Sequence, residues 1–265
     1  MNIFLRELKA HRWGLLFWSI GMVMLVASGM AKYSAYEAAG ESVVDMIEAI
    51  PETLQAVFGF SGFDLTTAAG FYGVIFMYIA VMGAVHAALM GSGLIAKEER
   101  DRTSEFLYAK PYSRSRILTA KLLAGLVNML AFNLATYASS AYFVDYYNQD
   151  EPFGREIMLL MVGLFFLQLI FFSIGALIAG TSHHPKTASS KATSIMFGTF
   201  LLSFLINLNE KLDWLSFVTP FKYFDAATLM NEGALDPVYV ALSIAIIAVA
   251  IILAYRRYTA RDLSI

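Results

Sequence analysis

The segment GFYGVIFMYIAVMGAVHAALMGSGLI, residues 70–95, contains no Asp, Glu, Lys or Arg. An α-helix needs about 20 predominantly apolar residues to cross the hydrocarbon core of a bilayer, so this segment is long enough to span a membrane. It is followed almost at once by KEERDRTSEFLYAKPYSRSRILTAK, residues 97–121, which holds the densest charge cluster of the chain. A charge at the bilayer centre costs about 2.5–3.5 kcal/mol on insertion scales, so this second stretch must lie in water or against protein.

The composition of the whole chain extends this interpretation. Of 265 residues, 58% are hydrophobic and 15% are charged, whereas a soluble domain carries about 25% charged residues. The apolar excess predicts six transmembrane helices, at Trp13–Ala31, Gly70–Ile95, Ile117–Tyr142, Ile157–Gly180, Ala192–Leu208 and Val238–Tyr255. The fifth block is the shortest, and it is the candidate for a tilted, broken or partly spanning helix. The sequence therefore predicts an all-α integral membrane protein with a single transmembrane domain, residues 1–265.

The N-terminal stretch MNIFLRELKAHR, residues 1–12, alternates apolar and basic side chains. This pattern is typical of a short amphipathic helix that lies at the membrane interface, and the alternative is a simple basic flank. A basic start before an apolar run is also found in cleaved signal peptides. We favour an uncleaved first span, because the apolar run is long for a signal and five further spans follow.

The positions of the basic residues predict the orientation of the spans. With the N-terminus placed in the cytoplasm, 15 of the 19 Lys and Arg residues fall on cytoplasmic segments, and those that do not are Lys32, Arg155, Lys211 and Lys222. Cytoplasmic enrichment of Lys and Arg sets the orientation of membrane proteins. Both termini are therefore expected on the cytoplasmic side, and the loop after the second span, residues 97–116, is expected there too.

Two connections on the outer side contain apolar residues. Residues 43–60 place apolar side chains at helical spacing around Pro51, which predicts one or two short helices on the outer membrane face. Residues 214–230 are rich in aromatic side chains and are interrupted by Pro220. This segment is too short to span, so it predicts interfacial or re-entrant helices whose irregular backbone is sheltered by protein.

The charged loop has the chemistry of a docking element. Thr103 can cap a short helix, Glu105 lies in its first turn, and Pro111 ends it. Phe106, Leu107 and Tyr108 add a small apolar cluster inside a charged rim, which suits burial against a partner. The alternative, which the composition alone slightly favours, is that the charges only hold the topology of the spans.

The stretch EERDRTSEFLYAKPYSRSRILTAKLLAG, residues 98–125, resembles the corresponding loop of ABC-2-type transporter permeases. The resemblance rests on Glu98, Glu99, Arg100, Thr103, Glu105, Leu107, Pro111, Ser113, Arg114 and Lys121. Where that family often has a glycine before the threonine, this chain has Arg102. The six-span plan, IPETLQAVFG at residues 50–59, TPFKYF at 219–224 and YRRYTARDL at 255–263 extend the resemblance over essentially the whole chain.

The resemblance implies the permease subunit of an ABC exporter in the cytoplasmic membrane of a prokaryote. It implies a second permease, as a homodimer or a heterodimer, and two copies of a separate ATPase subunit that binds ATP and Mg. It also implies that the loop is the coupling helix that sits in a groove of the ATPase. The residues assigned to ATPase coupling are Glu98, Glu99, Arg100, Arg102, Thr103, Glu105, Phe106, Leu107, Pro111 and Arg114.

Several motifs are absent from the sequence. It has no G-x-x-x-x-G-K-[ST] loop to cradle phosphates, no H-E-x-x-H, no G-x-S-x-G and no cysteine. We therefore expect no catalytic, cofactor or metal site on this chain, and no role as an enzyme. The net charge of -2 gives no indication of nucleic-acid binding.

The predicted spans contain few polar side chains: His86, Asn128, Asn133, Gln168 and Ser173. Their simplest interpretation is hydrogen bonding between helices, although an intramembrane ionisable residue is a functional candidate. Small residues, among them Gly83, Gly91, Gly93 and Gly175, predict close helix packing. The aromatic-rich spans suit an amphipathic or lipid-like substrate, unless those rings face bilayer lipid or a dimer interface. A secondary transporter or channel and a non-catalytic membrane assembly factor remain alternatives.

Overall fold

The computed structural model describes residues 2–51, 54–55, 58–60, 62–101, 112–148, 153–182 and 184–260. Every regular element in these ranges is a helix, and the order is α1 (Ile3–Ala39), α2 (Glu41–Glu48), α4 (Ala68–Arg100), α6 (Arg114–Tyr147), α7 (Gly154–Thr181), η1 (Pro185–Thr187), α8 (Ala188–Leu208), η2 (Glu210–Phe217), α9 (Pro220–Tyr223), α10 (Ala226–Glu232) and α11 (Pro237–Ala260). Six helices of the described chain are long and apolar enough to cross a membrane: α1, α4, α6, α7, α8 and α11. The predicted all-α membrane architecture is confirmed.

Several of these helices are longer than the apolar blocks that predicted them. With 33 residues and a rise of about 1.5 Å per residue, α4 is about 50 Å long, well beyond the roughly 30 Å of a hydrocarbon core. Its last residues, Lys97 to Arg100, extend into the predicted loop, and α6 already begins at Arg114. The predicted loop is correspondingly shorter at both ends, and its centre, residues 102–111, lies outside the described residues.

The N-terminal residues and the fifth span are both regular helices. Residues 3–12 form the first turns of α1 and are continuous with the first span, so they do not form the separate interfacial helix that the sequence predicted. No proline or glycine occurs there to break the backbone ladder. The fifth span, α8, is unbroken over 21 residues, which gives about 32 Å and is enough to cross a bilayer.

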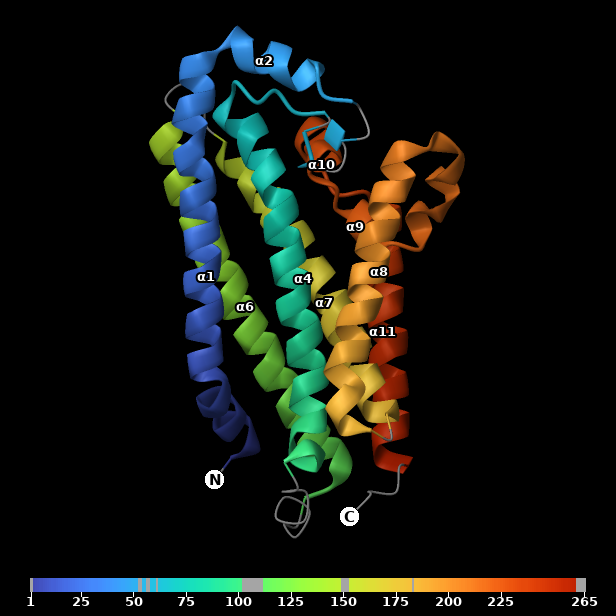
Figure 1. Cartoon of the computed structure of the whole chain (residues 1–265). Coiled ribbons are helices and arrows are strands. Elements are labelled where there is room, and N and C mark those ends of the chain that lie inside the picture. Colours follow the sequence, from blue (N-terminus) through green and yellow to red (C-terminus); the bar gives the residue numbers. More distant parts are fainter. Residues whose placement is uncertain are drawn as a thin grey trace.

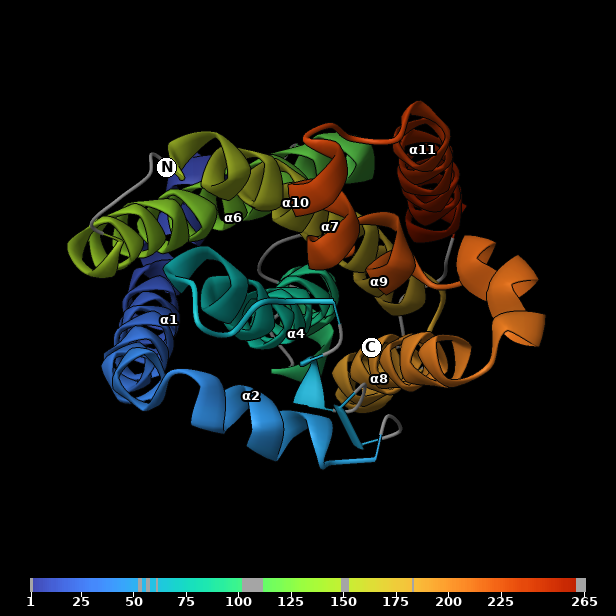
Figure 2. The same ribbon diagram turned by 90° about the horizontal axis from the view of Figure 1, so that it is seen from above.

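The long helices pack around one central pair. α4 and α7 share the most extensive interface and lie at the centre, α1 packs on α6 at one side, and α11 and α8 lie at the other side against α7 and α4. The view from above shows this order (Figure 2). The first residues of α1, the end of α4, the start of α6 and the last residues of α11 lie at the same end of the bundle (Figure 1), which we call the loop end.

The α4–α7 interface depends on small residues. A Cβ atom at Gly91 would lie 2.1 Å from the backbone oxygen of Phe172, and one at Gly175 would lie 2.7 Å from the oxygen of Ala88. Such distances are far below van der Waals contact, so both positions require glycine. Gly93 is different, because a Cβ there would meet nothing within 4 Å. Of the small residues indicated by the sequence, Gly93 therefore does not serve this packing.

Short helices occupy the other end of the bundle, which we call the opposite end. α2 lies across it, α9 lies near the upper part of α8, and α10 packs against α7 and α4 (Figure 1). Pro220 is the first residue of α9, where its missing N–H costs no helical hydrogen bond. The two connections that the sequence marked as apolar and proline-interrupted thus contain short helices: α2 in the first, and parts of η2, α9 and α10 in the second.

Candidate functional site

A cluster of charged side chains at the loop end joins three of the long helices. Lys121 on α6 is fully buried, and its Nζ donates hydrogen bonds to Glu98 Oε2 and to the backbone oxygen of Leu94, both on α4. Glu98 is itself buried. Residues 98 and 121 lie on either side of the loop centre, so this ion pair joins α4, which leads into the loop, to α6, which follows it.

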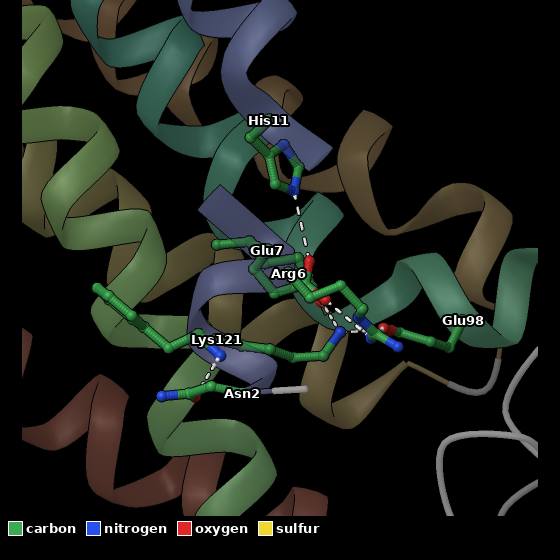
Figure 3. A network of polar contacts seen from close by, with 8 residues as sticks. Asn2, Arg6, Glu7, His11, Glu98 and Lys121 are labelled. Atoms are coloured by element: carbon green, nitrogen blue, oxygen red, sulfur yellow. Dashed lines mark hydrogen bonds and ion pairs between the residues drawn. The ribbon is translucent and has the colours of Figure 1, made fainter. Parts of the chain in front are cut away.

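The N-terminal turns of α1 complete the cluster. Arg6 lies between two carboxylates, with its guanidinium 2.9 Å from Glu7 Oε1 and 3.3 Å from Glu98 Oε1. Glu7 is almost fully buried, and His11 Nε2 lies 3.8 Å from its second oxygen. Figure 3 shows these side chains converging from α1, α4 and α6. The charges alternate in sign through the cluster, which is the arrangement that makes buried charge tolerable.

Local sequence features place the side chains. Ser113 caps α6, because its Oγ accepts a hydrogen bond from the N–H of Arg116 at 3.3 Å. Asn2 caps α1 in the same way, with Oδ1 accepting from Phe4 N–H at 3.1 Å. Both caps fix where a helix begins, and therefore fix the register at which Lys121 and Arg6 reach α4.

The start of α6 is also joined to the C-terminal helix. Thr119 Oγ1 and Tyr255 Oη share a hydrogen bond of 2.7 Å, and Arg114 Nη1 lies 3.5 Å from the backbone oxygen of Thr259. The residues that flank the loop thus contact α1, α4, α6 and α11. The loop ends of these four long helices are therefore joined by polar contacts.

The structure describes four of the ten predicted coupling residues, and it places each of them differently. Glu98 belongs to the buried cluster, Arg114 faces α11, and Arg100 forms an exposed ion pair of 3.1 Å with Asp101. Glu99 is half-buried on α4. The remaining predicted residues lie outside the described ones, and they are Arg102, Thr103, Glu105, Phe106, Leu107 and Pro111.

Sequence reasoning missed the contribution of α1. It treated residues 1–12 as an amphipathic flank, whereas Arg6, Glu7 and His11 are part of the charged cluster. One signal was present, because Glu7 is the only acidic residue in that basic stretch. An acid among basic residues can pair with one of them, and Glu7 does so with Arg6.

The polar residues within the spans are buried, but they do not form a second charged site in the described chain. Asn133 Nδ2 on α6 donates to Met161 O at 3.2 Å and to Gln168 Oε1 at 3.4 Å, both on α7. The expected hydrogen bonding between helices is therefore confirmed for this pair. His86 lies between the rings of Trp18 and Phe132, at centroid distances of 5.3 and 4.5 Å.

We expect Arg6→Gln to weaken the attachment of α1 to α4. A hydrogen bond to a charged group contributes about 1.5–3 kcal/mol, but Arg6 is partly exposed and solvent screening reduces this, so we expect a loss of about 1 kcal/mol. The measurement is the unfolding midpoint of the purified variant in detergent. Lys9→Gln is the matched control, because Lys9 is exposed on the same helix. Equal midpoints for the two variants would contradict the bridging role of Arg6.

The comparisons with known proteins agree with this architecture. A family model described as ABC-2 family transporter protein matches residues 1–263. No curated protein matches the chain significantly. The family match covers all six long helices and both sides of the charged loop.

Proposed function

The chain belongs to the ABC-2 transporter family and is a membrane-spanning permease, and from this premise we propose that it is driven by a separate ATPase that docks on the loop between α4 and α6. Two ATPase subunits and a second permease, most simply another copy of this chain, complete the transporter. ATP and Mg bind to the ATPase subunits. The sequence supports the separate ATPase, because it contains no phosphate-cradling loop of its own.

The observation that carries the proposal is the buried Glu98–Lys121 pair. A docking loop transmits a movement only if its ends are fixed to the elements that must move. The pair joins the ends of α4 and α6, Arg6 extends the connection to α1, and Thr119 extends it to α11. Closure of the ATPases would then tilt these helices together. Without these contacts, the loop could move while the helices stayed in place.

The direction, cargo and location follow from the same proposal. The distribution of basic residues favours a cytoplasmic loop end, in the plasma membrane of a prokaryote, with the ATPases on the cytoplasmic side. The family resemblance favours export. The aromatic-rich spans favour an amphipathic or lipid-like cargo.

The test is purification of the tagged chain from its native membrane in mild detergent, followed by mass spectrometry of the proteins that accompany it. We expect a stoichiometric partner with a Walker A motif. Phe106→Ala removes the apolar centre of the predicted docking helix, so this variant should lose most of the partner. Lys32→Gln, an exposed charge near the far end of α1, is the control and should retain it.

A preparation without an ATPase, under conditions that keep another transporter complex of the same membrane intact, would contradict the proposal. It would favour a secondary transporter or a non-catalytic assembly factor. Retention of the partner by the Phe106→Ala variant would instead contradict only the docking role of the loop. Both variants must elute as a single folded species for either conclusion.

A further inference from the structure

We infer that a cavity at the opposite end, between α4 and α8, binds an amphiphile with one alkyl chain and an anionic headgroup. The cavity has a volume of about 300 Å³. This is at the lower end of the range of small-molecule sites, about 300–1,000 Å³, and suits a single chain rather than a whole two-chain lipid. The inference concerns binding to the permease itself and does not depend on the ATPase.

The cavity arises because α4 and α8 diverge. Toward the loop end the helices touch, and Ser92 Oγ lies 3.0 Å from Ser189 Oγ. Toward the opposite end the two helices separate (Figure 1). The space between them is lined by Phe76, Met77 and Ala80 from α4 and by Phe200, Ser203 and Phe204 from α8. Residues from the 59–63 connection and from α9 and α10 line the rest of it.

The walls of the cavity are aromatic and held in place. Phe200 on α8 packs against Phe204 at a centroid distance of 4.7 Å and against Phe221 on α9 at 5.1 Å. Phe224 stacks on Phe166 of α7 at 5.6 Å. Rings fixed by their neighbours lose little conformational freedom when a ligand enters, so an alkyl chain would meet a preformed apolar surface.

A cation stands beside this apolar surface. The side chain of Lys222 lines the cavity, and its Nζ donates a hydrogen bond of 2.7 Å to Asn207 Oδ1. No ion pair involves Lys222 in the described part of the chain. Asp225 also lines the cavity, but its carboxylate caps α10 by accepting from the N–H and hydroxyl of Thr228 at 3.3 and 3.2 Å. One of the three Nζ donors of Lys222 is used by Asn207, so donors remain for an anionic headgroup.

The short helix that carries Lys222 is fixed to the bundle. Thr219, fully buried, donates from its hydroxyl to the backbone oxygen of Thr199 on α8 at 2.8 Å. On the other side of Lys222, Tyr223 donates to the backbone oxygen of Phe217 and stacks on Tyr239 of α11. The backbone of Lys222 is thus held at a defined place relative to the phenyl rings, and its flexible side chain keeps the ammonium within reach of the headgroup of an amphiphile in the cavity.

The test uses native mass spectrometry of the full chain, purified in a neutral detergent and titrated with dodecyl phosphate. We expect one bound molecule per chain, and much weaker binding of the neutral dodecanol. Charge-assisted hydrogen bonds are about twice as strong as neutral ones, so Lys222→Gln should weaken dodecyl phosphate binding by about tenfold. Lys211→Gln removes another basic residue of this end that does not line the cavity, and it should bind like the wild type.

A second variant tests the position of the chain. Ala227 on α10 lines the cavity, and Ala227→Trp should fill it and abolish binding while Lys222 remains. Far-ultraviolet circular dichroism and a single elution peak establish that each variant is folded. Unchanged affinity of Lys222→Gln, or full binding by folded Ala227→Trp, would overturn the inference, and Lys222→Gln decides the matter if the tryptophan variant fails to fold.

Two sources of such a headgroup can be separated in the same experiment. If a membrane phospholipid accompanies the wild-type chain and is lost from Ala227→Trp, the natural occupant is bilayer lipid that inserts one chain. If the purified site is empty and takes up dodecyl phosphate, the occupant is a transported or regulatory amphiphile. Either result supports the site, and absence of both overturns it.

Discussion

Replacing Lys121 by methionine is expected to be the most damaging single change at the loop end. Lys121 is fully buried beside Glu98, so its removal leaves a carboxylate without its nearest cation in a site shielded from water. Removing one partner of a buried ion pair typically costs about 3–5 kcal/mol. Arg6 still reaches the other oxygen of Glu98, so we expect a loss near the lower value, about 3 kcal/mol, in the free energy of unfolding.

A double variant separates stability from transmission. Replacing a buried ion pair by apolar residues of similar size is often neutral, so Glu98→Met together with Lys121→Met should recover most of the lost stability. If the pair transmits movement, the recovered protein should still bind the proposed ATPase but fail to couple ATP hydrolysis to transport. Asp101→Asn, in an exposed ion pair with Arg100, is the control and should change stability by less than about 1 kcal/mol.

A double variant that is stable and also fully coupled would contradict the proposed role of the pair. It would show that Lys121 serves only to neutralise Glu98. A double variant that stays as unstable as Lys121→Met alone would point instead to Glu7, the other buried carboxylate of the cluster. The readouts are the unfolding midpoint in detergent and ATP hydrolysis by the reconstituted complex.

Replacing Gly91 by alanine is expected to disrupt the centre of the bundle. The added Cβ would lie 2.1 Å from the backbone oxygen of Phe172, and a backbone atom cannot rotate away as a side chain can. Either α4 and α7 must separate or the helix must distort. Overpacking of a core costs about 1–3 kcal/mol, and we expect the upper end or more because the obstacle is backbone.

Gly93→Ala is the matched control for this experiment. It lies on the same helix two positions later, and its Cβ would meet nothing within 4 Å. Alanine is favoured over glycine in a helix interior by about 0.5–1 kcal/mol, so Gly93→Ala should be neutral or slightly stabilising. The measurement is the unfolding midpoint and the yield of monodisperse protein. Similar results for both variants would contradict the inferred closeness of α4 and α7.

The sequence by itself determined the number and approximate positions of the membrane helices. Apolar length is a local property, and a run such as residues 70–95 is long and apolar enough to form a helix across a bilayer. The short helices at the opposite end could be expected for a similar reason, since Pro51 and Pro220 interrupt apolar segments that are too short to span. The charges that flank the loop were also visible, because positive-inside sorting acts on each segment separately.

Only the tertiary structure decided which faces and side chains meet. In a bilayer the lipid-facing side of a helix is as apolar as the side that packs on protein, so hydrophobic periodicity does not separate them. Gly91 and Gly93 look alike in the sequence, although only Gly91 lies against α7. The cavity between α4 and α8 exists because these two helices diverge, which the sequence does not show. Arg6 and Glu98 are 92 residues apart in the chain, and they form an ion pair only because α1 packs beside α4 and α6.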